Sequence, residues 1–372
     1  MKILHVITNL GMGGAETVFY HRMLYYHERG EMDQHLIYYL YDGLYVEKLR
    51  SLGFTVIKIM GLLHPCDPVG LYRFFSLVKK EHPLCIDASL WSAQIMARLV
   101  GALLRIPVIC QMHSDLRHHG VVRNLIDALV PQKHATFVAV TSLLLPLVKK
   151  KFSSASTVLI HNAVDLKRIK AGDAEKTSFY DKKKEDLLII GVSGRLVSLK
   201  QYHVFLKAIA LLASMTQKKM HALVIGEGPE KQNLIKLAYD LKIEDRVSFV
   251  GMQENVFDWY DLIDVLVSCS STEAFSMVIL EAMAAGKVVV ATESTNAREM
   301  ISHYQNGIML PKADPKQIAF ALLTLIQNDS LRQTLGAAAQ ETVLNTFDMS
   351  IIEQRYMQLY RSFFRQKLKK VE

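Results

Sequence analysis

The stretch Val265-Leu-Val-Ser-Cys-Ser-Ser-Thr-Glu-Ala-Phe-Ser-Met-Val-Ile-Leu-Glu281 predicts a strand, a loop and a helix in immediate succession. Its apolar start is typical of a buried strand, and a helix is expected to begin near Ser276 and to end before Gly286. Free N–H groups in the first turn of such a helix would face the carboxyl edge of a parallel sheet, where a diphosphate can bind. This stretch therefore predicts an α/β fold and the place of a ligand.

Strands that alternate with helices extend over both halves of the chain around this stretch. In the second half we expect strands at 187–192, 222–225, 247–250, 265–268 and 288–291. In the first half we expect strands at 3–8, 35–41, 55–59, 85–89, 108–112 and 137–140. Alternation of this kind predicts parallel βαβ units whose sheets are covered by helices on both faces.

A polar, charged segment at 167–186 separates the two patterned halves and is interpreted as a linker and loop. A chain of 372 residues is also too long for one ordinary core. We therefore predict an N-terminal Rossmann-like domain over 1–166 and a C-terminal one over 187–350. The tail, 351–372, has an apolar helical face and is expected to pack back on the first domain.

The composition is that of a globular protein, with 50% hydrophobic and 22% charged residues. The four cysteines lie far apart without the spacing of a metal site, which favours a reducing compartment. The apolar start is too short for a signal peptide, and no stretch is long enough to span a membrane. A net charge of +8 comes without a nucleic-acid-binding signature. We expect a cytoplasmic protein that binds no nucleic acid.

Glu273 and Glu281 are the strongest candidates for chemistry. Glu273 precedes the expected helix, whereas Glu281 lies nearly two turns along it, so one can face a sugar while the other reaches a ribose. The two do not flank one bond, as the carboxylates of a glycosidase must. Glu281 also interrupts an apolar helix, and a buried charge needs a partner. The competing interpretation is that Glu281 only solubilises the helix.

Two cations, Arg195 and Lys200, follow the strand at 187–192 and lie at the same edge of the sheet as the Glu273 loop. They can grip a pyrophosphate, the arginine by its fork and the lysine as a point charge. His113 ends the strand at 108–112, so it lies at the ligand-binding edge of the first sheet. A lone histidine is otherwise more often structural.

A glycine loop, Gly11-Met-Gly-Gly14, follows the first strand. Glu16 stands where the dinucleotide fingerprint has its third glycine, and no acidic residue follows at the usual distance. NAD binding is therefore disfavoured. Glycines at the start of a helix still let a ligand approach the backbone.

These residues together resemble the family 4 retaining glycosyltransferases, which have the GT-B fold. The matches extend over nearly the whole chain and comprise Gly13-Gly-Ala-Glu16, Asn162-Ala-Val-Asp165, Gly194-Arg195 with Lys200, Gly226-Glu-Gly-Pro229, Arg246-Val-Ser-Phe-Val-Gly251, and the pair Glu273 and Glu281. The glutamate pair is specific when it occurs with the Arg/Lys motif in this order. The chain departs from the family at Gln201, Ser276 and Thr295-Asn296, where glycine is common.

The resemblance implies two Rossmann-like domains whose parallel sheets face across a cleft that binds a nucleotide sugar. It assigns catalysis to Glu273, His113, Arg195 and Lys200. Arg195 and Lys200 would hold the donor diphosphate, and His113 would lie beside the sugar from the opposing domain. No metal and no cofactor are expected, because the nucleotide sugar is itself the co-substrate and such enzymes generally need no metal.

The resemblance also implies contacts that bind the substrate. Glu281 would bind the ribose, and the backbone of Gly251 and Met252 would meet the base. The remaining substrate contacts would come from Gly13, Gly14, Phe275, Ser276 and Met277. The segment from Phe275 to Met277 would lie near the sugar through its backbone.

We therefore expect a retaining hexosyl- or N-acetylhexosaminyl-transferase of polysaccharide biosynthesis. The donor would be a nucleotide diphosphate sugar, with UDP favoured, and the acceptor a saccharide or a lipid-linked molecule. Two alternatives remain. One is a nucleotide-sugar epimerase of the same architecture, and the other is a non-catalytic sugar-nucleotide-binding partner of another transferase.

An apolar run at 143–148 precedes Lys149-Lys-Lys151 in the first domain. Leucines in the interface and lysines on headgroups would suit peripheral contact with an anionic membrane at its cytoplasmic face. Helical spacing, however, places Leu144, Leu147 and Val148 on one buried face with the lysines as its solvated end. We favour this second interpretation.

Overall fold

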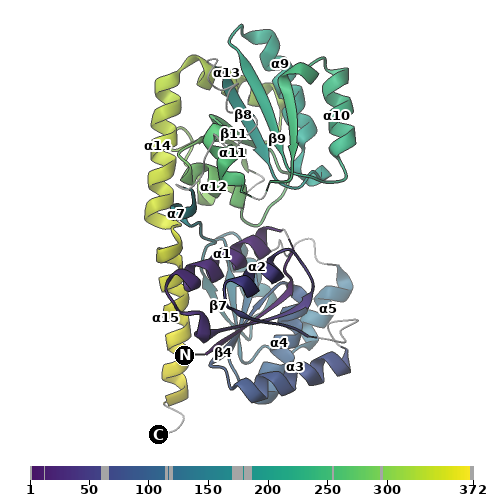
Figure 1. Ribbon diagram of the computed structural model, residues 1–372, viewed down its shortest axis with the longest axis vertical. Helices are drawn as coiled ribbons and strands as arrows, with labels where there is room; N and C mark the ends of the chain where they lie inside the picture. Colours follow the sequence, from purple (N-terminus) through teal and green to yellow (C-terminus); the bar gives the residue numbers. More distant parts are fainter. Residues whose placement is uncertain are drawn as a thin grey trace. The chain divides into compact units, whose positions relative to one another are not determined.

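The computed structural model describes residues 2–11, 13–59, 67–113, 116, 120–169, 179, 187–253, 255–293 and 296–368. The chain forms two compact units (Figure 1). The first comprises Met1–Ala163 and Met349–Glu372, and the second comprises Val164–Asp348. Most of the predicted linker, 170–186, lies outside the described residues apart from residue 179. Its start forms a short helix, α7 (Leu166–Ile169).

The first unit is built on a seven-stranded sheet in the order β3-β2-β1-β4-β5-β6-β7. Its strands are β1 (Ile3–Asn9), β2 (His35–Tyr41), β3 (Thr55–Lys58), β4 (Cys85–Ser89), β5 (Val108–Met112), β6 (Ala135–Ala139) and β7 (Ser156–Leu159). All neighbouring strands are parallel, and Ile3 of β1 lies opposite His35 on one side and Cys85 on the other. Strands β2 and β3 are added on one side of β1, and the strands from β4 onwards are added on its other side. Open α/β sheets bind ligands at such a reversal of strand order.

Helices connect these strands. They are α1 (Gly14–Glu28), α2 (Tyr45–Ser51), α3 (Pro68–Glu81), α4 (Trp91–Leu104), α5 (Val121–Leu129) and α6 (Leu144–Lys151). The start of α3 shows why the sequence folds in this way. The side chain of Asp67 accepts a hydrogen bond from the backbone N–H of Val69 at 2.9 Å, and Pro68 occupies the first helical position, where its missing N–H costs nothing.

The second unit is built on a six-stranded parallel sheet in the order β10-β9-β8-β11-β12-β13. Its strands are β8 (Leu188–Ser193), β9 (Met220–Ile225), β10 (Val247–Gly251), β11 (Val265–Ser268), β12 (Val288–Thr292) and β13 (Ile308–Leu310). Its helices after α7 are α9 (Tyr202–Met215), α10 (Lys231–Asp240), α11 (Val256–Leu262), α12 (Met277–Ala284), α13 (Pro315–Gln327) and α14 (Asp329–Thr346). The strand order reverses between β8 and β11, because β9 and β10 lie on one side of β8 and the later strands lie on the other.

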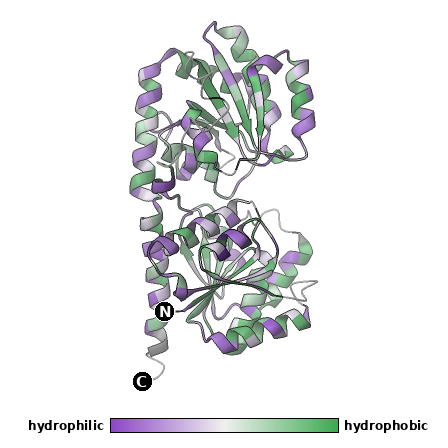
Figure 2. Ribbon diagram, in the orientation of Figure 1, coloured by the Kyte–Doolittle hydropathy of each residue, from purple (hydrophilic) through white to green (hydrophobic). Residues whose placement is uncertain are grey.

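Both sheets are strongly hydrophobic along their strands, and the polar residues gather on the helices (Figure 2). This distribution follows from the parallel arrangement, because helices cover both faces of each sheet and the strands are buried on both. The side chains of β5, β6, β9, β11 and β12, for example, are buried without exception. The predicted α/β class is confirmed.

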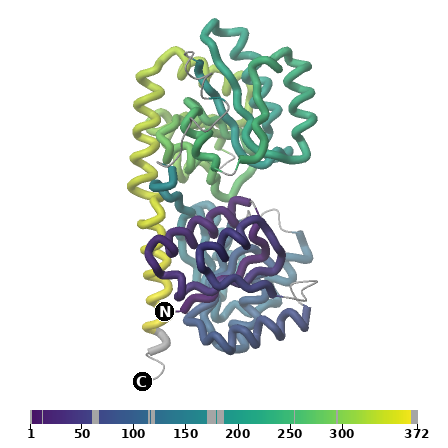
Figure 3. Tube along the Cα trace, in the orientation of Figure 1, coloured from purple at the N-terminus to yellow at the C-terminus, as the bar shows by residue number. Residues whose placement is uncertain are grey.

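The last helix, α15 (Met349–Leu368), belongs to the first unit (Figure 3). Its apolar face, which includes Ile352, Tyr356 and Tyr360, joins a core cluster with Ile3, Cys85 and other residues of the first sheet. The helix begins two residues before the predicted tail at 351.

Three elements of interest, β7, β13 and α5, were not predicted. β7 and β13 are short, and residues of β7 are only partly buried because it lies at the edge of its sheet. The third element is α5, which places apolar side chains on the outside of the unit. Among the described residues, no helix is long and apolar enough to cross a membrane.

Candidate functional site

The loops that follow β8 and β11 meet through two of the predicted site residues. Lys200 Nζ lies 2.6 Å from Glu273 Oε1, and both side chains are largely buried. The hydroxyl of Ser270 donates a second hydrogen bond to the same oxygen at 2.5 Å. Since β8 and β11 flank the reversal of strand order, the pair lies where a ligand of such a sheet is expected.

Backbone contacts fix these two loops against each other. The N–H of Ser271 donates to the carbonyl of Leu199 at 2.8 Å, and Cys269 Sγ donates to the carbonyl of Lys200 at 3.3 Å. The side chain of Asn296 bonds the carbonyls of Glu273 and Ala274. The ion pair is therefore held by the framework on both sides.

Three loops approach so closely here that they require glycine. Gly194 and Gly226 have φ angles of +125° and +133°, and a Cβ at Gly226 would collide with the backbone of Gly194. The N–H of Gly226 in turn donates to the carbonyl of Gly251 at 2.8 Å. Arg195 and Met252, which follow two of these glycines, are both exposed. The edge of the sheet thus presents one exposed cation beside the Lys200–Glu273 pair.

The predicted helix is α12, and its N-terminus carries no side-chain cap. Phe275, Ser276 and Met277, which lead into α12, are buried. Ser276 Oγ is buried and has no hydrogen-bond partner among the described residues. Free N–H groups in the first turn of a helix favour a negatively charged ligand.

Glu281 lies on α12 away from the Glu273 pair and is only 6% exposed. Its Oε2 accepts a hydrogen bond from the hydroxyl of Tyr260 at 3.1 Å. Burial raises the pKa of Glu281 to about 7, and the hydrogen bond from Tyr260 opposes that rise. The partner that a buried charge requires is therefore Tyr260 on α11. It was not predicted, since no local pattern joins the two helices.

In the first unit, Gly13 and Gly14 begin α1 directly after β1. Gly13 is the N-cap and offers no side chain to cap the helix, and the space beside Gly14 is open. Burial raises the pKa of Glu16, although hydrogen bonds from its own backbone N–H and from Asn9 lower it. The predicted glycine loop therefore places a bare helix start at the edge of the first sheet.

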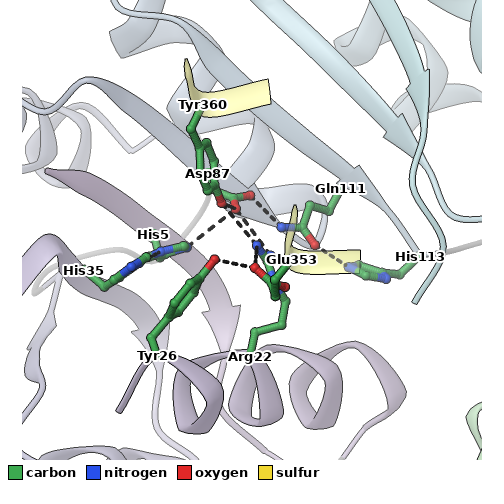
Figure 4. Close-up of polar contacts among 9 residues, drawn as sticks. All are labelled: His5, Arg22, Tyr26, His35, Asp87, Gln111, His113, Glu353 and Tyr360. Atoms are coloured by element: carbon green, nitrogen blue, oxygen red, sulfur yellow. Dashed lines mark hydrogen bonds and ion pairs between the residues drawn. The ribbon is translucent and has the colours of Figure 1, made fainter. Parts of the chain in front are cut away.

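His113 follows β5, and its side chain contacts that of Gln111 on the same strand (Figure 4). Its Nε2 lies 3.2 Å from Gln111 Oε1, and Gln111 Nε2 donates to Asp87 Oδ1 at 2.6 Å. Burial lowers the pKa of His113 to about 4, with a smaller contribution from the charge of Arg22. The histidine is therefore neutral at physiological pH.

Behind His113 lies a buried polar network that was not predicted (Figure 4). Asp87 Oδ2 accepts a hydrogen bond from the hydroxyl of Tyr360 at 2.8 Å and lies 3.4 Å from the guanidinium Nη1 of Arg22. Arg22 Nε donates to Glu353 at 2.6 Å. Asp87 offered one signal in the sequence, because it is a carboxylate inside an apolar strand. Its partners on α1 and α15 offered none.

No metal site appears in the part of the chain that the structure describes, where no three His, Cys, Asp or Glu side chains are grouped as ligands. Cys85, Cys110 and Cys269 are buried free thiols, and Cys66 lies outside the described residues.

The edge of the second sheet thus combines two cations, a carboxylate and an uncapped helix start. A family model described as "Glycosyl transferases group 1" matches residues 173–342, which include all of these groups. The second unit of the chain is therefore similar to the group 1 glycosyl transferases. The family resemblance noted in the sequence is confirmed.

Curated relatives of this family match the chain over different lengths. The lipopolysaccharide core biosynthesis glycosyltransferase LpsE of Rhizobium meliloti is 33% identical over 177 residues, which are 48% of this chain and 51% of that protein. The match thus spans about half the length of this relative. A Campylobacter jejuni enzyme, named as an N-acetylgalactosaminyltransferase acting on a diphospho-undecaprenol-linked sugar, is 24% identical over 303 residues, 81% of this chain and 78% of that protein.

Solved structures show the same fold over nearly the whole chain. The crystal structure of Anabaena HepE in complex with UDP has a TM-score of 0.83 and 21% identity, and covers 97% of this chain and 100% of that one. The two parallel sheets and this likeness establish the GT-B fold.

At two positions the backbone conformation would suit glycine better than the residue present. Gln201 and Asn296, where the resemblance leads us to expect glycine, both have positive φ angles, 51° and 53°. Glycine adopts this backbone conformation without steric cost, whereas asparagine and glutamine are strained in it to different degrees. Ser276, the third departure, has an ordinary φ of −85°.

Proposed function

We propose that this protein is a retaining glycosyltransferase that moves a sugar from a UDP-sugar to a saccharide or lipid-linked acceptor in polysaccharide biosynthesis. The observation that carries the proposal is the Lys200–Glu273 pair at the reversal of strand order in the second sheet, beside Arg195 and the start of α12. A catalyst of sugar transfer from a nucleotide diphosphate must stabilise a departing diphosphate. Two cations and a helix N-terminus supply this stabilisation.

The roles of these groups follow from their chemistry. Lys200 and Arg195 hold the diphosphate oxygens, and the negative charge that develops as the glycosidic bond breaks strengthens both contacts. No metal is required for this step in the proposal, because fixed cations neutralise the leaving group. A phosphate that engages Lys200 leaves Glu273 with the hydroxyl of Ser270 and with hydroxyl groups of the sugar.

The rest of the donor is proposed to extend along the neighbouring loops. Glu281, a buried acceptor, takes the hydroxyls of the ribose, and the backbone at Gly251 and Met252 meets the base. In the first unit, His113, Gly13 and Gly14 are proposed to bind substrate, as the family resemblance implies. Phe275, Ser276 and Met277 contribute backbone groups.

Two similar proteins support the class of donor that we propose. Anabaena HepE has been solved with UDP and with UDP-glucose, the latter with a TM-score of 0.80 to this chain. The Campylobacter relative is named for transfer of an N-acetylhexosamine in an α linkage to a lipid diphosphate acceptor. We therefore propose a UDP-hexose or UDP-N-acetylhexosamine as donor.

The experiment is a transfer assay with a panel of UDP-, GDP- and ADP-sugars and with saccharide and undecaprenyl diphosphate-linked acceptors. We expect transfer from a UDP-sugar and a product with the anomeric configuration of the donor, read by NMR. Inverted configuration would disprove retention. A protein that binds UDP-sugar tightly but releases no UDP with any acceptor would favour the non-catalytic alternative, and interconversion of UDP-sugars would favour the epimerase.

We further propose that the first unit contacts an anionic membrane, through α5 rather than through the run at 143–148. Of the three residues that the favoured interpretation of that run places on a buried face, Leu144 and Val148 are buried and Leu147 is half-buried. α5, in contrast, exposes its apolar side chains and buries a polar one. Val121 is 85% and Leu129 75% exposed, with Val122 and Leu125 also exposed, while the polar Asp127 is buried.

Asp127 explains why α5 lies in this way. It accepts a hydrogen bond from Trp91 at 3.1 Å and is paired with Lys151 at 2.7 Å and with Arg98 at 3.4 Å. Because Asp127 must face these partners, the apolar side chains of α5 are directed outwards. Lys151 belongs to the lysine run at the end of α6, so exposed Lys149 and Lys150 lie near an exposed apolar surface. Such a combination suits anionic lipid, because each cation near the surface adds about 1 kcal/mol of attraction.

Sedimentation with vesicles that contain an anionic lipid tests this contact. We expect binding that weakens with salt and with Leu125→Gln plus Leu129→Gln. The matched control is Leu103→Gln, a leucine on α4 that is 74% exposed. Equal loss in the control, or no sedimentation at low salt, would refute a membrane contact at α5.

A further inference from the structure

The orientation of Gln111 decides which nitrogen of His113 carries the proton. Asp87 is surrounded by donors, since it receives hydrogen bonds from Tyr360 at 2.8 Å and from Gln111 Nε2 at 2.6 Å and faces Arg22 at 3.4 Å. A carboxylate can only accept hydrogen bonds. The NH₂ end of the Gln111 amide must therefore face Asp87.

The other end of the amide then faces His113. Gln111 Oε1 lies 3.2 Å from His113 Nε2, and an amide oxygen is an acceptor, so Nε2 must be the protonated nitrogen. A neutral imidazole has one proton, and burial keeps the pKa of His113 at about 4. Nδ1 consequently carries a lone pair. It is buried and has no hydrogen-bond partner among the described residues.

Gln111 is itself held in place at both ends. Its main chain pairs within the sheet with Ser89 of β4 and Val138 of β6, and its carbonyl accepts a hydrogen bond from Gln94 Nε2 at 2.7 Å. The residue is buried, so its side chain exchanges no partner with water. Asp87 is anchored in turn through Arg22, which bonds Glu353 on α15. The chain of contacts runs from the C-terminal helix to His113 (Figure 4).

We infer that Gln111, oriented by Asp87, is a positioning residue that keeps His113 in its Nε2–H form and leaves Nδ1 as an acceptor for a hydroxyl group of the donor sugar. The second half of this inference rests on the proposed function. In the Nδ1–H form, the histidine would present a donor in that place instead. The position of a single proton thus decides whether a hydroxyl group donates a hydrogen bond to Nδ1 or accepts one from it.

The tautomer of His113 can be measured by ¹⁵N NMR of histidine-labelled full-length protein, with the signal assigned by comparison with His113→Gln. We expect an unprotonated Nδ1 in the wild type, a result that needs no variant in the network. Gln111→Met keeps the size of the side chain but removes the acceptor, so both tautomers should be populated. Asp87→Asn presents an NH₂ group to Gln111, so its amide can flip and the Nδ1–H form should increase.

Gln94→Met is the matched control, because it removes a buried hydrogen bond to the main chain of Gln111 and leaves its amide in place. It should keep the wild-type tautomer. An Nδ1–H signal in the wild type, or an unchanged single tautomer in both Gln111→Met and Asp87→Asn, would overturn the inference. A tautomer change in Gln94→Met equal to that in Gln111→Met would also overturn it, because general loosening would then explain both.

Kinetics separate this inference from the proposed function. Loss of one neutral hydrogen bond to the sugar should raise the KM for the donor by about two- to tenfold in Gln111→Met. If the tautomer changes and the KM does not, Gln111 positions His113 as inferred, but His113 does not contact the donor. If the tautomer is unchanged while transfer proceeds normally, the positioning role fails and the proposed function stands.

Discussion

Replacing Glu281 by glutamine should change the free energy of unfolding of the second unit in a pH-dependent way. The difference between variant and wild type should favour the variant more at high pH than at low pH. Burial raises the pKa of Glu281 from 4.5 to about 7. The folded unit therefore holds this proton more tightly than the unfolded chain does. Ionising Glu281 therefore lowers the free energy of unfolding of the wild type. This loss is absent at low pH, develops between about pH 4.5 and pH 7, and is complete above that range.

The size of the effect follows from the shift. A difference between 4.5 and about 7 corresponds to roughly 3 kcal/mol when Glu281 is fully ionised. Roughly 2 to 3 kcal/mol of this appears between pH 5 and pH 8, because the unfolded carboxyl is already mostly ionised at pH 5. The glutamine variant lacks this titration. Any penalty from its amide is the same at both pH values and cancels when they are compared.

Tryptophan fluorescence during urea unfolding measures the second unit separately. The chain has two tryptophans, so a Trp91→Phe background leaves Trp259, which lies beside Tyr260, as the reporter. Glu244→Gln, at an exposed glutamate of the same unit, is the matched control. If the difference in unfolding free energy between Glu281→Gln and wild type is the same at pH 5 and pH 8, the burial argument is wrong.

Three further predictions concern the site and the buried network. Changing Arg195 or Lys200 to alanine should weaken the binding of UDP and of the donor together, by roughly 1.5–3 kcal/mol for a charge-assisted contact, and unchanged affinities in calorimetry would remove both from the diphosphate site. Transfer should survive EDTA, and strict dependence on Mg²⁺ or Mn²⁺ would contradict the proposed clamp of cations. Glu353→Gln should destabilise the first unit by up to about 3–5 kcal/mol, because buried Arg22 loses the charge of its nearer carboxylate and keeps only Asp87 at 3.4 Å. Arg355→Gln, at an exposed position of the same helix, should leave the calorimetric melting temperature nearly unchanged.

The fold could be predicted from the sequence wherever a strand was apolar and flanked by a helix. The strands at 35–41, 85–89, 108–112 and 265–268 have the predicted bounds. β7 was missed because an edge strand buries little of its surface, so Ser156 and Thr157 give it no continuous apolar run. α5 was missed for a different reason. Its apolar residues face outwards, and a pattern that normally marks a buried face cannot reveal which side the fold turns inwards.

The site could be predicted in part, for a reason that is also physical. Lys200 and Glu273 follow neighbouring strands, so the parallel sheet alone brings their loops to one edge. The partners of Glu281 and His113 could not be found in this way. Tyr260 reaches Glu281 from another helix, and Gln111 has a role only because Asp87 and the groups around it orient its amide. Such contacts depend on packing between elements, which no local pattern records.

The return of α15 to the first unit has a consequence for the order in which this protein folds during synthesis. Arg22 and Glu353 are 331 residues apart, so the ribosome makes one partner of this buried pair long before the other. The second unit, continuous from Val164 to Asp348, can complete its core while translation proceeds. The first unit must wait with the buried face of its sheet uncovered and with Arg22 and Asp87 lacking their partners on the last helix. The half of the chain that is made first is therefore the half that finishes folding last, and it is this half that chaperones would be expected to bind.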